Sequence, residues 1–516
     1  MARRRISLLT VKRTATAAVV LAVLAGAFLF ADHLLDERRS RCGEGVVRKG
    51  PSGECVGVSD GSYAFADHLR PVTELIGREN ARAVESGEPY VSVAYMTAFT
   101  LNEDDSNSEE SVRHELQGAY LAQWRHNRSS TPRIRLLIAN AGSGSAHWEH
   151  TVGELVRRRD TDDRLVAVTG LGPSTDANLA ALRRLSGNGL ATVASTMTDT
   201  DIRGIRGFVR VTPTNRDEAW AAAGHLRREG VDTAVVVKDV ADRNLYARTL
   251  SRDFNAEFAE RGGEVVAEDK TFDSSIPGAW KNELWYISQQ LCEYRPQVVY
   301  FAGRGQHLTH FLDALANRDC ARWRFTVMTG DDTTNLTPRQ LAEAADSGIR
   351  VLYTGLAHPD MWRDDPEGVS PETIWFFQEG GRKGGAERAG AADGKADGKA
   401  GGGGEDEAAE GEDGGKKRLD DLFPQDARGD GQAMMSHDAV LTAATGARMA
   451  VRFDNAATGE TVGSMFRQMD GHQRVPGASG FLSFANDGNP RDKVLPVLEL
   501  KPDGNPVFVE AVAPRR

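Results

Sequence analysis

The chain has 516 residues, a formal net charge of −11, and a hydrophobic share of 40%. This length exceeds one ordinary hydrophobic core and predicts two or more folded units. Residues 1–13 carry five basic and no acidic side chains, which leaves −16 for the remainder. Such a strongly acidic body excludes nucleic acid as the expected partner.

An apolar run at residues 14–31 follows the basic residues 1–13. At about 1.5 Å per residue, a helix of this length just spans a hydrocarbon core of about 30 Å. A cleaved signal peptide is the alternative, but the Ala-x-Ala triplet at residues 25–27 lies inside the run rather than after it. We therefore expect a single-pass anchor in the cell membrane, with residues 1–13 in the cytoplasm and the bulk of the chain outside.

The four cysteines suit this extracytoplasmic address, where disulfides form. Cys42 and Cys55 bracket a glycine-rich loop, and Cys292 and Cys320 flank one strand-helix unit. A metal site is the alternative, but no Cys-x-x-Cys spacing is present. We expect two disulfides, the first of which lies in an extracytoplasmic stalk at residues 32–89.

Short apolar strands, most of them followed by a polar loop and an amphipathic helical stretch, make up the main body of the chain. Each strand is nearly continuously apolar, as expected for a parallel sheet that is covered by helices on both faces. This pattern predicts a doubly wound α/β protein, whose ligands bind beyond the carboxyl ends of the strands. The predicted strands are residues 90–95, 134–138, 165–169, 190–194, 233–237, 297–301 and 324–328.

The composition changes abruptly to Gly, Ala, Asp, Glu and Lys at residues 379–417. This stretch cannot bury a core and is expected to be disordered. Apolar spacing typical of a buried helix resumes at residues 433–453, and a strand-rich piece follows at 480–512. The low-complexity stretch is therefore expected to be an insertion within a domain.

Several stretches match one known family in their order and spacing: GLGPST at 170–175, ATVASTMTDTDI at 191–202, FVRVTPTNRDEAWAAAGHL at 208–226, VVYFAGRGQHLTHFLDAL at 298–315, SHDAV at 436–440 and GASGFLSFANDGNPRDK at 477–493. With them the chain resembles type 1 periplasmic binding proteins, especially the branched-chain amino acid binding proteins of ABC transporters. The resemblance implies two doubly wound parallel-sheet lobes, joined by a hinge, that close over a ligand. It places lobe 1 at residues 90–211 and 359–470, and lobe 2 at 212–358 and 471–516.

The resemblance implies that two loops of lobe 1 contact the ligand. Ser174 and Thr175 precede a predicted helix, so their hydroxyls and the free N–H groups of the helix would bind a ligand carboxylate. A plain helix cap is the alternative. Thr196 and Thr198 lie in the next loop and would offer hydroxyls, unless that loop is an ordinary turn.

Lobe 2 would contribute charged groups. Asp331 resembles in position the acidic residue that holds a ligand ammonium group in this family, with a helix cap or a salt bridge as the alternative. Asp242 and Arg304 stand where the family usually has aromatic walls. Arg304 would bind an anionic ligand group, or pair with Asp331 across an empty cleft. These departures argue against leucine, isoleucine or valine, and leave a more polar, amino-acid-like solute or a degenerate pocket.

Motifs for catalysis are missing from the sequence. GSGS at residues 142–145 is not a Gly-x-Ser-x-Gly elbow, and His147, Glu149 and His150 lack the His-Glu-x-x-His spacing. We expect no enzyme activity, no metal and no cofactor. The predicted function is solute binding for an ABC importer, with an ABC permease as partner. The alternative is a membrane-tethered sensor or scaffold with a degenerate pocket that acts through a partner protein.

Overall fold

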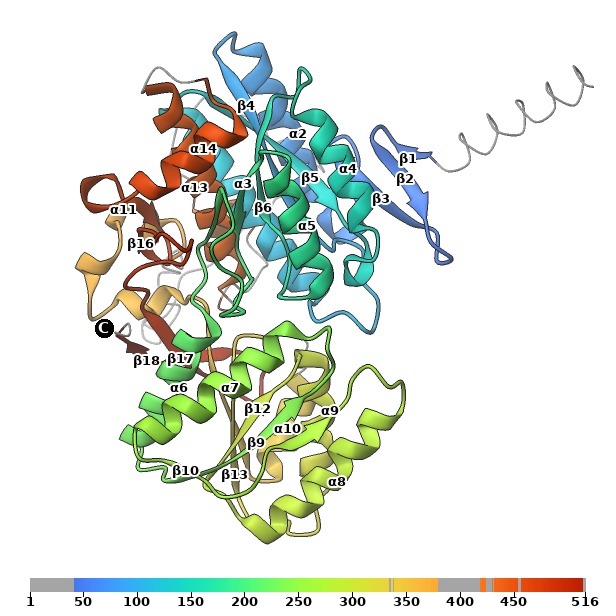
Figure 1. Ribbon diagram of the computed structural model, residues 1–516, viewed down its shortest axis with the longest axis vertical. Helices are drawn as coiled ribbons and strands as arrows, with labels where there is room; N and C mark the ends of the chain where they lie inside the picture. The colour runs from blue at the N-terminus through green and yellow to red at the C-terminus, as the bar shows by residue number, and fades with distance from the viewer. Residues whose placement is uncertain are drawn as a thin grey trace, which may run out of the picture.

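The computed structural model describes residues 41–333, 336, 338–378, 418–423, 429, 431–452 and 456–513. These residues form two α/β lobes arranged end to end, with lobe 1 above lobe 2 in Figure 1. The expected anchor at 14–31 and the expected insertion at 379–417 lie outside the described residues. Within the described ranges, the structure has no helix that is long and apolar enough to cross a membrane.

Lobe 1 is built on an eight-stranded sheet in the order β1-β2-β3-β5-β4-β6-β7-β8. In this order, the five neighbouring strands β5, β4, β6, β7 and β8 run parallel and are almost wholly buried. This confirms the strands that were predicted in this half of the chain. The five parallel strands are β4 (Tyr90–Thr97), β5 (Arg133–Asn140), β6 (Leu165–Gly170), β7 (Ala191–Ala194) and β8 (Phe208–Arg210).

Much of the segment that we expected to form a stalk is part of lobe 1. The strands β1 (Arg41–Gly43), β2 (Val46–Lys49) and β3 (Glu54–Ser59) extend the sheet in antiparallel fashion beyond β5. Helix α2 (Arg70–Glu85) then packs against β5 and α3 (Glu109–Ser129). Because their apolar side chains are buried in the core of lobe 1, these elements are not a separate spacer.

Lobe 2 contains a second eight-stranded sheet, in the order β10-β9-β12-β13-β14-β17-β18, with β11 also paired to β9. The six strands numbered β9 to β14 run parallel to one another. Strands β17 and β18 extend the sheet beyond β14 and are antiparallel. The strands of this sheet are β9 (Thr233–Asp239), β10 (Glu264–Val265), β11 (Lys270–Phe272), β12 (Val298–Ala302), β13 (Phe325–Thr329), β14 (Ile349–Thr354), β17 (Leu495–Leu500) and β18 (Pro506–Val512).

Helices cover both faces of each sheet, as the continuous apolar strands require (Figure 1). In lobe 1, one face carries α2, α3, α13 (Gln432–Arg452) and α14 (Gly459–Met465), and the other carries α4 (Trp148–Arg158) and α5 (Asp176–Gly187). In lobe 2, one face carries α6 (Asn215–Arg228) and α7 (Leu245–Glu260), and the other carries α8 (Ala279–Tyr294), α9 (Gly305–Ala316) and α10 (Pro338–Asp346).

The chain crosses between the lobes after β8, after β14 and after β16 (Gly480–Leu482). The last crossing comes later in the sequence than we expected. Strand β15 (Val475–Gly477) pairs with β16 and packs against α13, and Phe484 still belongs to the core of lobe 1. Residues 475–484, expected in lobe 2, therefore lie in lobe 1, because they cover the apolar side of α13.

Both expected disulfides are present. Cys42–Cys55 joins β1 to β3, with a Cα–Cα distance of 6.0 Å. Cys292–Cys320 joins the end of α8 to the turn before β13, with a Cα–Cα distance of 5.6 Å. Each bridge therefore links elements of a single lobe and leaves the relative position of the lobes free.

Helices α3 and α13 approach each other closely at Gly118. A Cβ atom added there would lie 2.0 Å from the carbonyl oxygen of Ala433 and 2.5 Å from Oγ of Ser436. We expect Gly118→Ala to lower the free energy of unfolding by about 2 kcal/mol, because one helix backbone must move away. Gly187→Ala, at the end of α5, is the control, since its Cβ meets nothing within 4 Å. Urea denaturation measures both, and equal stability of the two variants would contradict this close approach.

Candidate functional site: the cleft between the lobes

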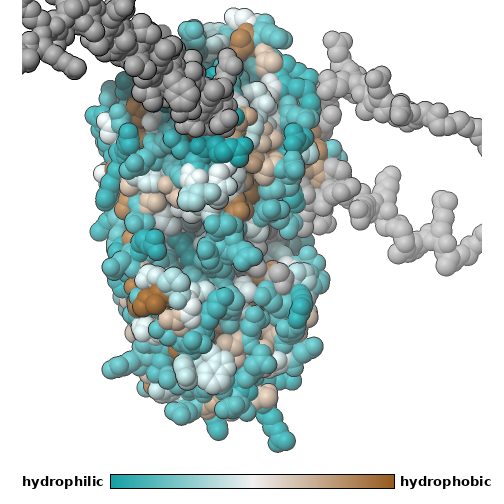
Figure 2. All heavy atoms as spheres, turned by 90° about the vertical axis from the view of Figure 1, so that its right-hand side faces the viewer, coloured by the Kyte–Doolittle hydropathy of each residue, from teal (hydrophilic) through white to brown (hydrophobic). Residues whose placement is uncertain are grey.

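The two lobes enclose a cavity of about 560 Å³ where the carboxyl ends of their parallel strands face each other. Lobe 1 contributes the loop after β4 and the start of α5, and lobe 2 contributes the loops after β9 and β11 and the start of α9. The face shown in Figure 2 is mainly hydrophilic around the middle of the molecule, where the lobes meet. The volume lies within the range of small-molecule sites, which is about 300 to 1,000 Å³.

Arg304 bridges the two lobes at the inner side of this cavity. From the start of α9 in lobe 2, its Nη2 donates a hydrogen bond of 2.6 Å to the carbonyl oxygen of Ser174 in lobe 1. Its Nη1 donates to Oδ2 of Asp332 at 3.2 Å, and the guanidinium carbon lies 4.9 Å from the centre of the Tyr246 ring. Only 6% of Arg304 is exposed. The ion pair is thus with Asp332, and not with Asp331 as our alternative interpretation had it.

A pair of buried carboxyl groups lies next to this bridge. Glu218 Oε2 accepts hydrogen bonds from Oγ1 of Thr354 at 3.0 Å and from the backbone N–H of Asp331 at 3.1 Å. The other oxygen of Glu218, Oε1, and Oδ1 of Asp331 have no hydrogen-bond partner among the described residues. Burial raises the pKa of both carboxyl groups, that of Asp331 to about 7, with a further contribution from the charge of Asp332. Asp331 therefore holds its proton at pH values where an exposed aspartate has lost it.

The raised pKa of Asp331 predicts how stability depends on pH. Between about pH 4 and pH 7 the folded protein binds a proton at this site that the unfolded chain has released, so stability falls as pH rises through this window. We expect a slope of about −1 kcal/mol per pH unit from this group. Asp331→Asn should flatten the slope. Thermal melting from pH 4 to pH 8 tests this, and an unchanged profile in the variant would contradict it.

The hydroxyls of Ser174 and Thr175 make contacts within lobe 1. Oγ of Ser174 accepts a hydrogen bond from the backbone N–H of Asp199 at 3.0 Å. Oγ1 of Thr175 caps α5 by accepting from the N–H of Asn178 at 3.2 Å, and Thr175 also lines the cavity. The structure therefore brings together Thr175 and Arg304 as lining residues, and Ser174 reaches Arg304 through its carbonyl group.

The remaining residues expected to bind ligand lie around the cavity without lining it. Thr196 is half-buried, and its Oγ1 has no hydrogen-bond partner among the described residues. Thr198 is buried, and its carbonyl oxygen accepts from the N–H of Asn215 at 2.6 Å. Asp242 is exposed, whereas its neighbour Arg243 lines the cavity. Asp331 lies deeper, beside Tyr246.

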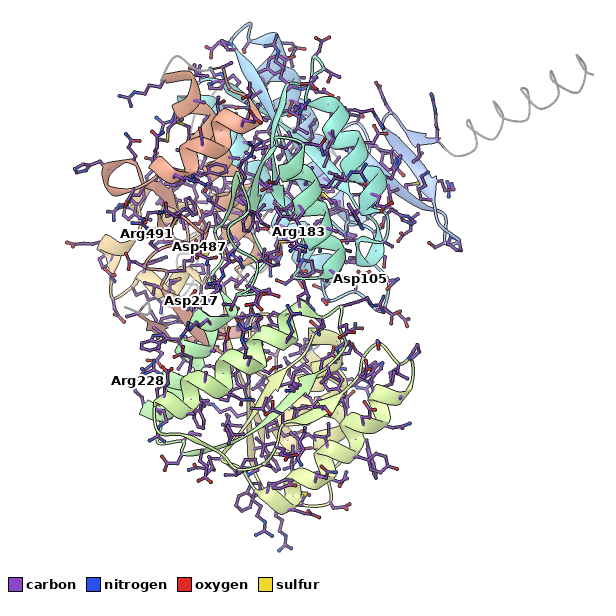
Figure 3. All side chains as sticks on the ribbon, in the orientation of Figure 1. Asp105, Arg183, Asp217, Arg228, Asp487 and Arg491 are labelled. Atoms are coloured by element: carbon purple, nitrogen blue, oxygen red, sulfur yellow. A yellow bond between two sulfur atoms is a disulfide. The ribbon has the colours of Figure 1, made fainter. Side chains whose placement is uncertain are left out.

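Our sequence interpretation missed several residues that line the cavity. Asp105 comes from the loop after β4 and lies at the edge of lobe 1 that faces lobe 2 (Figure 3). Trp280 and Lys281 begin α8, and His307 lies in the first turn of α9. For Asp105 and His307 the available signal was positional, because each lies in the segment that follows a predicted strand. The strand β11 is only three residues long and was not predicted, so the loop that precedes α8 was overlooked.

Other contacts between the lobes hold them together. Nε2 of Gln306 donates to the carbonyl oxygen of Asp104 at 2.8 Å. Near the crossings, Oγ1 of Thr200 donates to Oδ2 of Asp253 at 2.7 Å, and Arg252 forms an ion pair with Asp201 at 3.0 Å. The described molecule is thus in a closed arrangement that is stabilised by contacts between its own lobes.

A second cavity of about 630 Å³ lies in lobe 1, at the amino ends of β4 and β6 and beside the start of α14. All of its lining residues come from this one lobe. A solute bound there would make no contact across the hinge, so it could not drive closure of the two lobes. The cleft between the lobes is therefore the candidate site.

Two doubly wound lobes, several chain crossings between them, and a cavity at the facing carboxyl ends of both sheets define a two-lobed α/β architecture with a cleft between the lobes. No protein-family model matches the chain, and no curated protein matches it in sequence. Solved structures do match it in fold.

Leucine-binding protein LivK from Thermotoga maritima has a TM-score of 0.57 at 15% sequence identity, covering 82% of this chain and 98% of that protein. LivJ from Streptococcus pneumoniae, in complex with isoleucine, has a TM-score of 0.55 at 13% identity, covering 82% of this chain and 100% of that protein. A solute-binding protein from R. palustris, in complex with benzoate, has a TM-score of 0.55 at 14% identity, covering 82% and 97%. The chain therefore has the type 1 periplasmic-binding-protein fold, as its sequence motifs indicated.

Proposed function

We propose that this protein is an extracytoplasmic solute-binding protein that closes over a small polar solute and delivers it to an ABC importer. The observation that carries the proposal is the cavity of about 560 Å³ lined by both lobes of a hinged fold. Solved proteins with this fold include a leucine-binding protein, a substrate-binding protein of a branched-chain amino acid transporter in complex with isoleucine, and a solute-binding protein of an ABC transporter in complex with benzoate. The chain would do no chemistry on its ligand.

A solute bound in this cavity would couple binding to lobe movement. It would favour the closed form only if it makes more contacts there than in an open form, and groups from both lobes provide such contacts. Of the residues singled out in the sequence, Thr175 and Arg304 are the proposed direct contacts, because both line the cavity. Asp331, Ser174, Thr196, Thr198 and Asp242 would contact a solute only after Arg304 or the neighbouring loops move.

The route to the importer is the second part of the proposal. Residues 14–31 would anchor the chain in the cell membrane, with the lobes outside, and the partner would be an ABC permease. The apolar run after the basic residues 1–13 supports this arrangement. An anchored binding protein stays close to its permease and does not depend on diffusion to reach it.

The bridge at Arg304 favours a second candidate function, that of a membrane-tethered sensor or scaffold. Arg304 links lobe 2 to the Ser174 carbonyl oxygen through the protein's own atoms, so the lobes are held together without a solute. A protein fixed in one form in this way would act through a partner and not through transport.

Solute uptake separates these two functions. A thermal-shift screen of the full-length protein against amino acids, organic acids, small peptides and polyamines would first identify a stabilising solute. Deleting the gene should then abolish high-affinity uptake of that solute if the protein serves an importer. Unchanged uptake would contradict the importer proposal and favour the sensor or scaffold.

A further inference from the structure

The space that is open to a solute lies outside the Arg304 bridge. Arg304, Asp332 and Tyr246 fill the inner cleft with hydrogen-bonded and stacked side chains. The cavity is bounded by the loop after β4 on one side and by the starts of α8 and α9 on the other. A solute would therefore bind between these loops, and its charge must suit the two walls.

The two walls differ in charge. The lobe 2 wall carries Arg243 and Lys281, and neither forms an ion pair with a carboxylate of the described residues. The lobe 1 wall carries Asp104 and Asp105, together with hydroxyl and amide groups. Asp105 is occupied within lobe 1, where it accepts from Oγ of Ser143 at 2.6 Å and from the N–H of Gly144 at 2.7 Å. The cavity-lining cations that lack a carboxylate partner among the described residues are thus on lobe 2.

An aromatic surface adjoins these cationic groups. The Trp280 ring lines the cavity, and Nζ of Lys281 lies 5.3 Å from the centre of this ring. The His307 ring packs edge-on against Trp280 at 4.9 Å between ring centres, and only 4% of His307 is exposed. Nδ1 of His307 has no hydrogen-bond partner among the described residues. Burial lowers the pKa of His307 to about 4, so its imidazole is neutral at pH 7 and adds no charge to this wall, and its Nδ1 lies 3.8 Å from Oδ2 of Asp239.

We infer that the solute is an organic anion whose carboxylate binds the lobe 2 wall at Arg243 and Lys281, and whose ring or carbon chain packs on Trp280. This inference rests on the proposed function and names the class of its ligand. Polar substituents of the solute would face the lobe 1 wall, where Asn107 and Thr175 offer an amide and a hydroxyl group. The polarity is opposite to the one we expected from the sequence, which placed the carboxylate on lobe 1 and an ammonium group at Asp331.

Calorimetric titration of the full-length protein in detergent tests the inference. The probes are sodium salts of benzoate, 3,4-dihydroxybenzoate, glutarate and gluconate, with benzamide and glutaramide as neutral counterparts, leucine as a zwitterion and putrescine as a cation. At least one anion should bind saturably and at least tenfold more tightly than its neutral counterpart. The double variant Arg243→Gln/Lys281→Gln should weaken that binding by tenfold to a hundredfold, since each charge-assisted hydrogen bond contributes strongly.

Arg339→Gln is the matched control, because Arg339 is an exposed cation of lobe 2 that pairs with Glu343 outside the cavity. It should bind the anion as the unchanged protein does. Anion binding that survives the double variant would overturn the assigned site. Binding of leucine or putrescine but of no anion would overturn the ligand class and leave the proposed function intact. A folded protein that binds none of the probes would overturn both.

Discussion

Replacing Arg304 with methionine should lower the free energy of unfolding by about 3 kcal/mol, because it leaves the carboxylate of Asp332 buried without its cation. Both side chains of this pair are largely shielded from water, with exposures of 8% and 9%. The change also removes the hydrogen bond to the Ser174 carbonyl oxygen in the opposite lobe. We therefore expect the lobes to separate, and small-angle X-ray scattering should record a larger radius of gyration.

Arg339→Met is the control for this experiment. Its ion pair with Glu343 is exposed to water, and such pairs contribute less than about 0.5 kcal/mol. A double variant, Arg304→Met/Asp332→Asn, should regain part of the lost stability, because the unpaired charge is then removed as well. An Arg304→Met protein with the radius of gyration and stability of the unchanged protein would show that this bridge does not hold the lobes together.

Removing the Cys292–Cys320 disulfide should destabilise lobe 2 by about 3.5 kcal/mol. The bridge closes a loop with a sequence separation of 28 residues, and the chain-entropy model assigns this cost to a loop of that length. The variant Cys292→Ala/Cys320→Ala should unfold at lower denaturant concentration. Hydrogen exchange measured by mass spectrometry should show faster exchange in α8 and β13, the elements that the bridge ties together.

The second bridge gives the matched comparison. Cys42→Ala/Cys55→Ala opens a loop with a sequence separation of 13 residues, for which the model gives about 3 kcal/mol, and it affects only the outer strands of lobe 1. Exchange should then increase in β1 to β3 and stay unchanged in lobe 2. Equal effects of the two variants on α8 would contradict the assignment of each bridge to one lobe.

The sequence was sufficient to predict the layered α/β fold, for a physical reason. A strand such as β6, which is buried along its whole length, needs cover on both faces, and a parallel sheet with crossover helices provides it. The loops at the strand ends then had to lie together, which correctly placed Thr175 and Arg304 at one cavity. Local patterns were enough for these predictions.

The partners of the side chains in the cleft could not be predicted in the same way. Ser174 and Arg304 are separated by 130 residues, and their contact depends on how far the lobes close. The choice between Asp331 and Asp332 depends on which of two adjacent side chains turns toward the guanidinium group. The prediction of a stalk was wrong for a related reason. Strand β3 pairs with the free edge of β5, and β2 and β1 then extend the sheet, so the position of these short strands depends on a strand later in the chain.

The position of β1 has a mechanical consequence. The chain enters the described molecule at Arg41, in the outermost strand of the lobe 1 sheet, and the Cys42–Cys55 bridge ties that strand to β3. Any constraint transmitted along the chain from residues 1–40 therefore acts on lobe 1 alone. The covalent chain reaches lobe 2 only through the crossings, so lobe 2 would move relative to lobe 1 once the contacts made by Arg304 and Gln306 break. A neighbouring protein that is stationary with respect to lobe 1 would therefore register an arriving solute as a displacement of lobe 2.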